Sequence, residues 1–376
     1  MQKVKVCHVS SAHSVYDDRI FFKECSSLAQ QFDVHVIAIG EKDEVLNNVQ
    51  IHALPKSSSR FNRFFLLQIK ILIQAFKINA KVYHFHDPDL IVFGLIQKLL
   101  GKKVIYDMHE LVYFQINDKD WLGNGWIKKM VSSIYLVFEK MGVRFFDKII
   151  IAEDGYWNYI NTNYKKQIYK FIAIRNFSIY DLIKHTDPNL SIKNNNNRII
   201  VYAGGLSKIR GIKEIVDAIQ TIENITFLTL GQWENDDYKK QCELADINNK
   251  MNYIGLVKMD KVYSYLKIAD IGIANLYHKP NYLTSLPIKA FEYMASGIPI
   301  IMSDFPYWIE TFNKCALFVN PLDANDIKGK IELLLSDNQL SSKLADAGNK
   351  LVIEKYTWEA ESKLLIMHYQ KLVSEN

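Results

Sequence analysis

The segment V-Y-A-G-G-L-S-K-I-R-G, residues 201–211, indicates the fold most directly. An apolar run from Arg198 predicts a strand, the pair Gly204-Gly205 predicts a tight turn, and a helix is expected over 212–222. A strand joined by such a turn to a helix is the unit from which parallel α/β sheets are built. The two glycines do not form G-x-G-x-x-G, which disfavours a nicotinamide dehydrogenase.

The same alternation of strand and helix continues on both sides of this segment. Further strands are predicted over residues 4–9, 34–39, 81–85, 103–108, 148–152, 225–230, 271–274 and 298–302. We therefore predict an α/β chain of two Rossmann-like, doubly wound domains facing a cleft. Their bounds are an N-terminal domain over 1–177, a polar linker over 178–197, a second domain over 198–357, and a C-terminal helix over 358–376 that is expected to pack back on the first domain.

Composition narrows the class of protein. The 376 residues suit two domains, and 49% hydrophobic and 23% charged residues are ordinary for a folded protein. The net charge of +5 fits an anionic small molecule or an anionic membrane surface, and we predict no nucleic-acid partner. The cysteines form no C-x-x-C pair and have no histidine at zinc-ligand spacing. We therefore expect neither disulfides nor a zinc site, in keeping with a cytoplasmic protein.

A second informative segment, residues 284–301, reads T-S-L-P-I-K-A-F-E-Y-M-A-S-G-I-P-I-I. It predicts a helix over 286–295 with Ser285 as its N-cap. Lys289 and Glu292 are three residues apart and therefore share a face of this helix. The N-terminus of a helix is a natural seat for phosphate. A carboxylate further along can accept hydrogen bonds from the two vicinal hydroxyls of a ribose.

This segment resembles the donor domain of the retaining family-4 glycosyltransferases of the GT-B fold, of the type that assembles bacterial glycans. That family carries Glu-x7-Glu followed by Ala-x-Gly-x-Pro. Glu292 matches the second glutamate, which in the family binds the nucleotide ribose, and the tail is present as Ala295, Gly297 and Pro299. The first glutamate falls on Thr284, and this departure leaves the identity of the donor sugar open.

The glycine turn resembles the same family. The family commonly has Gly-Arg-Leu-x-x-x-Lys-Gly there, and its arginine and lysine hold the diphosphate. In this chain those positions are Gly205 and Arg210, so that one cation is lost and one is exchanged. Arg210 can still bind phosphate with two parallel hydrogen bonds. Lys208 or Lys289 is expected to supply the missing charge.

Polar residues in the N-terminal half predict the acceptor side. Residues 103–110, K-V-I-Y-D-M-H-E, form a predicted strand that delivers Asp107, His109 and Glu110 to the cleft. The resemblance implies that His109 lies near the donor sugar, so it is our catalytic candidate, expected to position the sugar more than to act as a base. The alternative is a strand-end histidine satisfied at the surface. Acceptor or sugar contacts are also expected from the polar loop that holds His13, Asp18 and Arg19.

Asp87 and Asp89 form an Asp-x-Asp pair, which in other glycosyltransferases holds a metal ion. The flanking β-α pattern instead favours capping of the helix that starts near Leu90. We therefore predict that the reaction requires no metal and no cofactor.

Residues 56–81 hold six basic residues and no acidic one, interleaved with phenylalanines. Such a helix can lie on an anionic membrane, and a packed helix with a basic solvent face is an equal alternative. The apolar stretch 64–76 is too short and too polar to cross a bilayer. We predict a cytoplasmic protein that can bind peripherally to the inner face of the plasma membrane.

The predicted activity is transfer of a sugar from a nucleoside diphosphate to a hydroxyl of a glycan acceptor, which can be lipid-linked. The alternatives are a related epimerase or hydrolase that acts on nucleotide sugars and a non-catalytic subunit that binds them. The donor base, the sugar, the acceptor and the oligomeric state stay open.

Overall fold

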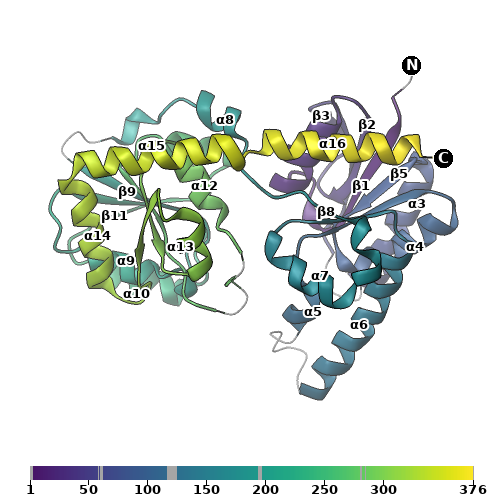
Figure 1. Cartoon of the computed structure of the whole chain (residues 1–376), viewed down its shortest axis with the longest axis horizontal. Coiled ribbons are helices and arrows are strands. Elements are labelled where there is room, and N and C mark those ends of the chain that lie inside the picture. Colours follow the sequence, from purple (N-terminus) through teal and green to yellow (C-terminus); the bar gives the residue numbers. More distant parts are fainter. Residues whose placement is uncertain are drawn as a thin grey trace. The chain divides into compact units, whose positions relative to one another are not determined.

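The computed structural model describes residues 3–57, 59, 62–116, 125–193, 197–279, 282–283 and 285–375. The chain divides into two compact units. The N-terminal unit combines Met1–Asn176 with Ala360–Asn376, and the C-terminal unit is Phe177–Glu359. Each unit is built on its own largely parallel sheet with helices on both faces (Figure 1). The predicted α/β class with two Rossmann-like domains is therefore confirmed.

The N-terminal unit has an eight-stranded sheet in the order β3-β4-β2-β1-β5-β6-β7-β8. All neighbouring strands are parallel except β3 and β4, which form an antiparallel pair. The strands are β1 Lys5–Ser14, β2 Asp33–Ile39, β3 Glu44–Leu46, β4 Val49–Leu54, β5 Val82–Phe85, β6 Lys103–Met108, β7 Lys148–Ile151 and β8 Phe171–Ala173.

Helices cover both faces of this sheet. The π-helical turns are η1 Asp18–Cys25 and η2 Arg63–Leu67, the 3-10 turns are η3 Pro88–Leu90, η6 Asp154–Tyr156 and η7 Lys165–Lys170, and the α-helices are α1 Ser26–Leu28, α3 Gln68–Ile78, α4 Ile91–Leu99, α5 Val112–Gln115, α6 Gly125–Phe145, α7 Trp157–Asn163 and the C-terminal α16 Trp358–Ser374. Figure 1 shows α16 along one face, whereas α3, α4 and α6 lie on the other.

Alternation along β5 separates an apolar core from a polar one. Tyr83 and Phe85 point into the hydrophobic core that includes residues of α3, α4 and α6. His84 and His86 point to the opposite face, because successive side chains of a strand alternate. Both histidines are fully buried, so this face of the sheet buries polar groups as well.

The C-terminal unit has a six-stranded, fully parallel sheet in the order β11-β10-β9-β12-β13-β14. The strand order reverses between β9 and β12, and ligands bind α/β sheets at the carboxyl ends of such strands. The strands are β9 Arg198–Ala203, β10 Ile225–Leu230, β11 Met251–Gly255, β12 Ile271–Ala274, β13 Ile300–Ser303 and β14 Ala316–Val319. The helices are α8 Tyr180–His185, η8 Leu190–Ile192, η9 Lys208–Arg210, α9 Ile212–Ile219, α10 Asp236–Ala245, α11 Met259–Leu266, α12 Ile288–Ala295, α13 Pro306–Phe312, α14 Ala324–Ser336 and α15 Asn338–Lys355.

The stretch 178–197, which its polar composition suggests as a linker, holds α8 and η8 in the structure. Ile183 of α8 is fully buried in the core of the C-terminal unit, and the Asn189 amide donates a 2.9 Å hydrogen bond to the Ser264 carbonyl. Most of this segment is therefore a packed part of the C-terminal unit.

Candidate functional site

Two glycines bring the ends of β9 and β10 together in the C-terminal unit. Gly204 follows β9 with φ +132° and Gly231 follows β10 with φ +141°, a conformation that favours glycine. A Cβ on Gly231 would lie 1.9 Å from the Gly204 carbonyl oxygen, so a larger residue does not fit. The turn lies where the strand order reverses, and this is the expected place for a ligand.

Lys289 comes from the first turn of α12 and reaches the glycine turn. Its Nζ lies 3.6 Å from the centroid of the Tyr202 ring, and a Cβ on Gly204 would be 3.0 Å from it. The Nζ atom is buried, and no acceptor in the described part of the chain bonds it. Burial and the Arg210 cation lower the pKa of Lys289 well below its usual range, against the opposing effect of Glu292. An anion at the turn would supply the acceptors that this cation lacks.

Three other predicted donor residues lie around Lys289. Arg210 ends η9 and is close enough to repel the Lys289 cation, and Gly205 is exposed and accepts a 3.3 Å hydrogen bond from Tyr202 Oη. Glu292 is half-buried and accepts a 3.3 Å hydrogen bond from Tyr263 Oη. The structure thus gathers two cations and a carboxylate at one edge of the sheet.

The start of α12 differs from the prediction. The helix begins at Ile288 with Pro287 as its N-cap, so Ser285 does not cap it. A proline disfavours helical geometry in the residue before it, which here is Leu286. The Ser285 carbonyl instead accepts a 2.7 Å hydrogen bond from Trp308 Nε1. Thr284 lies outside the described residues.

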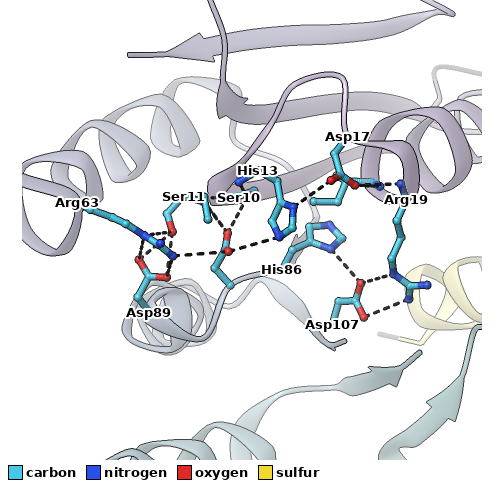
Figure 2. A network of polar contacts seen from close by, with 12 residues as sticks. Ser10, Ser11, His13, Asp17, Arg19, Arg63, His86, Asp89 and Asp107 are labelled. Carbon is cyan, nitrogen blue, oxygen red and sulfur yellow. Dashed lines mark hydrogen bonds and ion pairs between the residues drawn. The ribbon is translucent and has the colours of Figure 1, made fainter. Parts of the chain in front are cut away.

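The N-terminal unit has a polar cavity of about 260 Å³ at the carboxyl ends of its strands. Three predicted residues line it: Asp107 near the end of β6, and His109 and Glu110 directly after that strand. The other polar residues of the lining are His13, Arg63, His86, Asp87 and Tyr106. Figure 2 shows how His13, Arg63, Asp107 and their partners connect.

Asp87 and Asp89 bind the end of β1, and the prediction that they cap a helix is wrong. Asp87 Oδ2 accepts hydrogen bonds from Ser10 Oγ at 2.6 Å and from the Ser11 amide at 2.7 Å. Asp89 Oδ1 accepts one from Arg63 Nη2 at 2.8 Å (Figure 2). Neither η3 nor α4 has a side-chain cap. The parallel pairing of β1 with β5 places the two strand ends side by side. Both carboxylates therefore accept hydrogen bonds from residues distant in sequence and not from the first turn of the helix.

His13 pairs with Asp17, which the sequence interpretation passed over in favour of Asp18. Their Nδ1 and Oδ2 atoms are 3.0 Å apart, and this bond raises the pKa of His13. Burial would raise the pKa of Asp17, but hydrogen bonds from His13 and the Ile20 amide outweigh it and lower the value to about 2. Asp18 is exposed and does not line the cavity. The N-cap preference for aspartate before a helix could have identified Asp17.

Arg19 holds Asp107 and does not itself line the cavity. It is 7% exposed, and its Nε and Nη2 lie 3.0 and 3.2 Å from the two Asp107 oxygens. Burial would raise the pKa of Asp107, but Arg19 and His86 hold it well below its usual range. Arg19 was expected to contact the sugar, but in the structure it positions Asp107 instead.

His109 presents its ring to the cavity. Its carbonyl accepts a 2.8 Å hydrogen bond from Tyr156 Oη, whereas its buried Nδ1 has no hydrogen-bond partner among the residues described. The ring meets His13 edge to face with centroids 5.4 Å apart. A ring held through its backbone, with an unpaired nitrogen, is suited to bind a ligand hydroxyl.

Residues 184–351 match the family model described as glycosyl transferases group 1. An uncharacterized glycosyltransferase of Methanocaldococcus jannaschii is 24% identical over 179 residues, which are 46% of this chain and 45% of the relative. The lipopolysaccharide core biosynthesis glycosyltransferase LpsE of Rhizobium meliloti is 22% identical over 165 residues, 43% and 46% of the two chains. The chain thus spans about half the length of these curated relatives.

Solved structures resemble the whole chain. Sucrose-phosphate synthase of Thermosynechococcus elongatus has a TM-score of 0.77 at 16% identity, with 100% of both chains covered. HepE of Anabaena, solved with UDP and glucose, has a TM-score of 0.70 at 13% identity, with 99% of this chain and 100% of that one covered. These similarities show the GT-B fold for this chain.

Within the described residues, every helix is too short or too polar to cross a membrane.

Proposed function

We propose that this chain is a retaining glycosyltransferase of family 4 that moves a sugar from a nucleoside diphosphate to a hydroxyl of a glycan, in bacterial surface-polysaccharide assembly. The observation that carries the proposal is the buried Lys289 amino group, which faces the glycine turn within the region that matches group 1 glycosyl transferases and has no hydrogen-bond partner in the described structure. A diphosphate supplies the acceptors that Lys289 lacks. Glu292 is suited to accept from ribose hydroxyls.

In the proposed reaction the sugar C1–O bond to the diphosphate breaks, and a bond from C1 to the acceptor oxygen forms on the same face. The proton of the acceptor hydroxyl passes to the leaving phosphate. Lys289 and Arg210 stabilise the charge that develops on that phosphate. Because two cations of the chain serve this purpose, the proposed reaction needs no metal.

His109 is the proposed catalytic residue, and its unpaired Nδ1 would hydrogen-bond the transferred sugar. The cavity that it shares with His13 and Glu110 would receive the acceptor. Asp107, fixed by Arg19, would accept from a sugar hydroxyl. We assign the acceptor side to this cavity because its lining is polar, as a glycan requires.

The segment 56–81 is our proposed contact with the membrane, outside its positions 58, 60 and 61, which the structure does not describe. Phe64, Phe65, Ile69, Ile73 and Phe76 are each 51–58% exposed, and the exposed Lys70 and Lys77 accompany them. A packed helix would bury these phenylalanines, so their exposure favours an anionic bilayer. Such a protein would act at the inner face of the plasma membrane on lipid-linked glycans. Sedimentation with anionic and with neutral vesicles tests this, and equal binding to both would contradict it.

The test of the activity is a product analysis. The purified chain is incubated with UDP- and GDP-sugars and bacterial glycan acceptors, and proton NMR gives the anomeric configuration of the product. We expect the configuration of the donor. An inverted product would exclude the retaining mechanism. Free sugar formed equally without an acceptor would indicate a hydrolase.

A further inference from the structure

Three histidines and one glutamate meet in the polar core of the N-terminal unit. His8 of β1 and His84 of β5 are cross-strand partners in register, and His86 directly follows the last residue of β5. Glu24 comes from the π-helical turn η1. The four residues are each 0% exposed. We call this group the histidine cluster.

The ligand atoms of the cluster surround one point. Glu24 Oε2 lies 3.7 Å from His8 Nδ1, 3.7 Å from His84 Nδ1 and 3.9 Å from His86 Nε2. His8 Nδ1 and His86 Nε2 are 3.0 Å apart, and the cluster offers four ligand atoms that all lie within 4.8 Å of one another. Bonds of about 2.0–2.1 Å place the ligands of tetrahedral zinc roughly 3.3 Å apart. The four separations given above, 3.0 to 3.9 Å, bracket this spacing.

The Glu24 carboxylate is poorly satisfied without a cation. Across the described residues, neither of its oxygens accepts a hydrogen bond. Its ionic partner is Arg19, whose Nε lies 3.2 Å from Glu24 Oε1, but the same guanidinium also serves Asp107. Two buried carboxylates therefore share one guanidinium, and Lys23 is the other cation that acts on Glu24. A buried charge must be balanced by a cation or a proton.

Two of the three histidines have the surroundings of metal ligands, whereas His84 Nε2 has no hydrogen-bond partner among the described residues. Histidine ligands usually donate their other ring N–H to a carboxylate or another oxygen. His86 Nδ1 lies 3.0 Å from Asp107 Oδ2, and His8 Nε2 lies 3.1 Å from Tyr369 Oη of α16.

We propose that His8, Glu24, His84 and His86 bind one Zn²⁺ ion in a closed, four-coordinate structural site that ties β1, η1 and β5 together. Three imidazoles and a carboxylate are ligands that zinc accepts, and full burial leaves no open position for chemistry. The 2.8 Å contact between Tyr369 Oη and His84 Nδ1 is the one hydrogen bond that the ion replaces at His84. The ion also fixes the His86 tautomer that donates to Asp107 in the cavity. The proposal stands whether or not the chain transfers sugar.

The first test uses the full wild-type chain, purified without a metal-binding tag. Elemental analysis should find one zinc per chain. After removal by a chelator, the melting temperature should fall, and added Zn²⁺ should restore it. Added Co²⁺ should give the visible absorption of tetrahedral cobalt. Protein that contains no metal when purified and takes up neither ion would overturn the proposal, and a proton would then balance Glu24.

Variants locate the ion. Glu24→Gln and His84→Asn should each lower the zinc content from one per chain to near zero. The control is His35→Asn, because His35 is 4% exposed on β2 and pairs with Cys7, on the other face of the sheet from the cluster. It should keep its zinc. Zinc retained by both cluster variants would overturn the proposal. If these variants do not fold, the cobalt spectrum and the melting shift of the wild type decide.

Discussion

Replacing Lys289 by methionine should change stability and nucleotide affinity in opposite directions. Leaving a buried polar group unpaired costs about 1–3 kcal/mol, and the contact with the Tyr202 ring returns about 1–2 kcal/mol. Methionine has a similar length and no charge, so the free energy of unfolding should rise by roughly 0.5 kcal/mol, the difference between the middle values of the two ranges. The lost charged hydrogen bonds to the diphosphate should cost about 2–3 kcal/mol, which raises Kd about 30- to 150-fold.

The assays are denaturant unfolding and calorimetric titration with UDP and GDP. Lys208→Met is the matched control, because Lys208 is exposed at the same turn and is the other cation that the sequence offered for the diphosphate. It should leave both stability and affinity nearly unchanged. If Lys289→Met loses stability and keeps its affinity, Lys289 is a structural residue and the reasoning is refuted. If Lys208→Met weakens binding instead, the missing charge was assigned to the wrong lysine.

Three further changes test other residues. Glu292→Ala should raise Kd for the nucleoside diphosphate about 10- to 150-fold and leave the affinity for pyrophosphate unchanged, since only the ribose contact is lost; equal calorimetric affinities for the nucleotide would rule out the ribose role. His109→Ala should lower kcat about 100-fold with Kd within about twofold, measured by turnover and titration, and a fully active variant would remove its catalytic role. His13→Gln should lower the melting temperature most below about pH 6.5, because the raised pKa of His13 gives a stabilisation that is lost as pH rises through that folded value. A pH-independent difference would show that the His13–Asp17 bond is not the source of that stability.

Local patterns predicted the fold because apolar residues repeat with one period in strands and with another in helices. The run before Gly204 and the amphipathic stretch after it appear in the structure as β9 and α9. The predicted start of the helix over 286–295 was wrong by about two residues. Because Pro287 disfavours helical geometry at Leu286, α12 begins at Ile288.

The sequence predicted those residues of the candidate site that lie in one segment. It did not predict contacts between residues of strands that are far apart in the sequence. Lys289 and Glu292 lie on one helix, so their common face followed from spacing. No pattern in the sequence indicates that the Tyr202 ring lies beside Lys289. Asp87 seemed to be a helix cap because its real donors, at the end of β1, are more than seventy residues away. The histidine cluster joins β1, η1 and β5, so the search for zinc-ligand spacing around cysteines did not detect it.

The central claim is that the glycine turn after β9 and the start of α12 bind the diphosphate of a sugar nucleotide. A crystal structure of the chain with bound UDP or GDP tests it most directly. We predict a phosphate oxygen within hydrogen-bond distance of Lys289 Nζ and the ribose hydroxyls on the Glu292 carboxylate. A nucleotide bound elsewhere, with Lys289 still unpaired, would contradict the account.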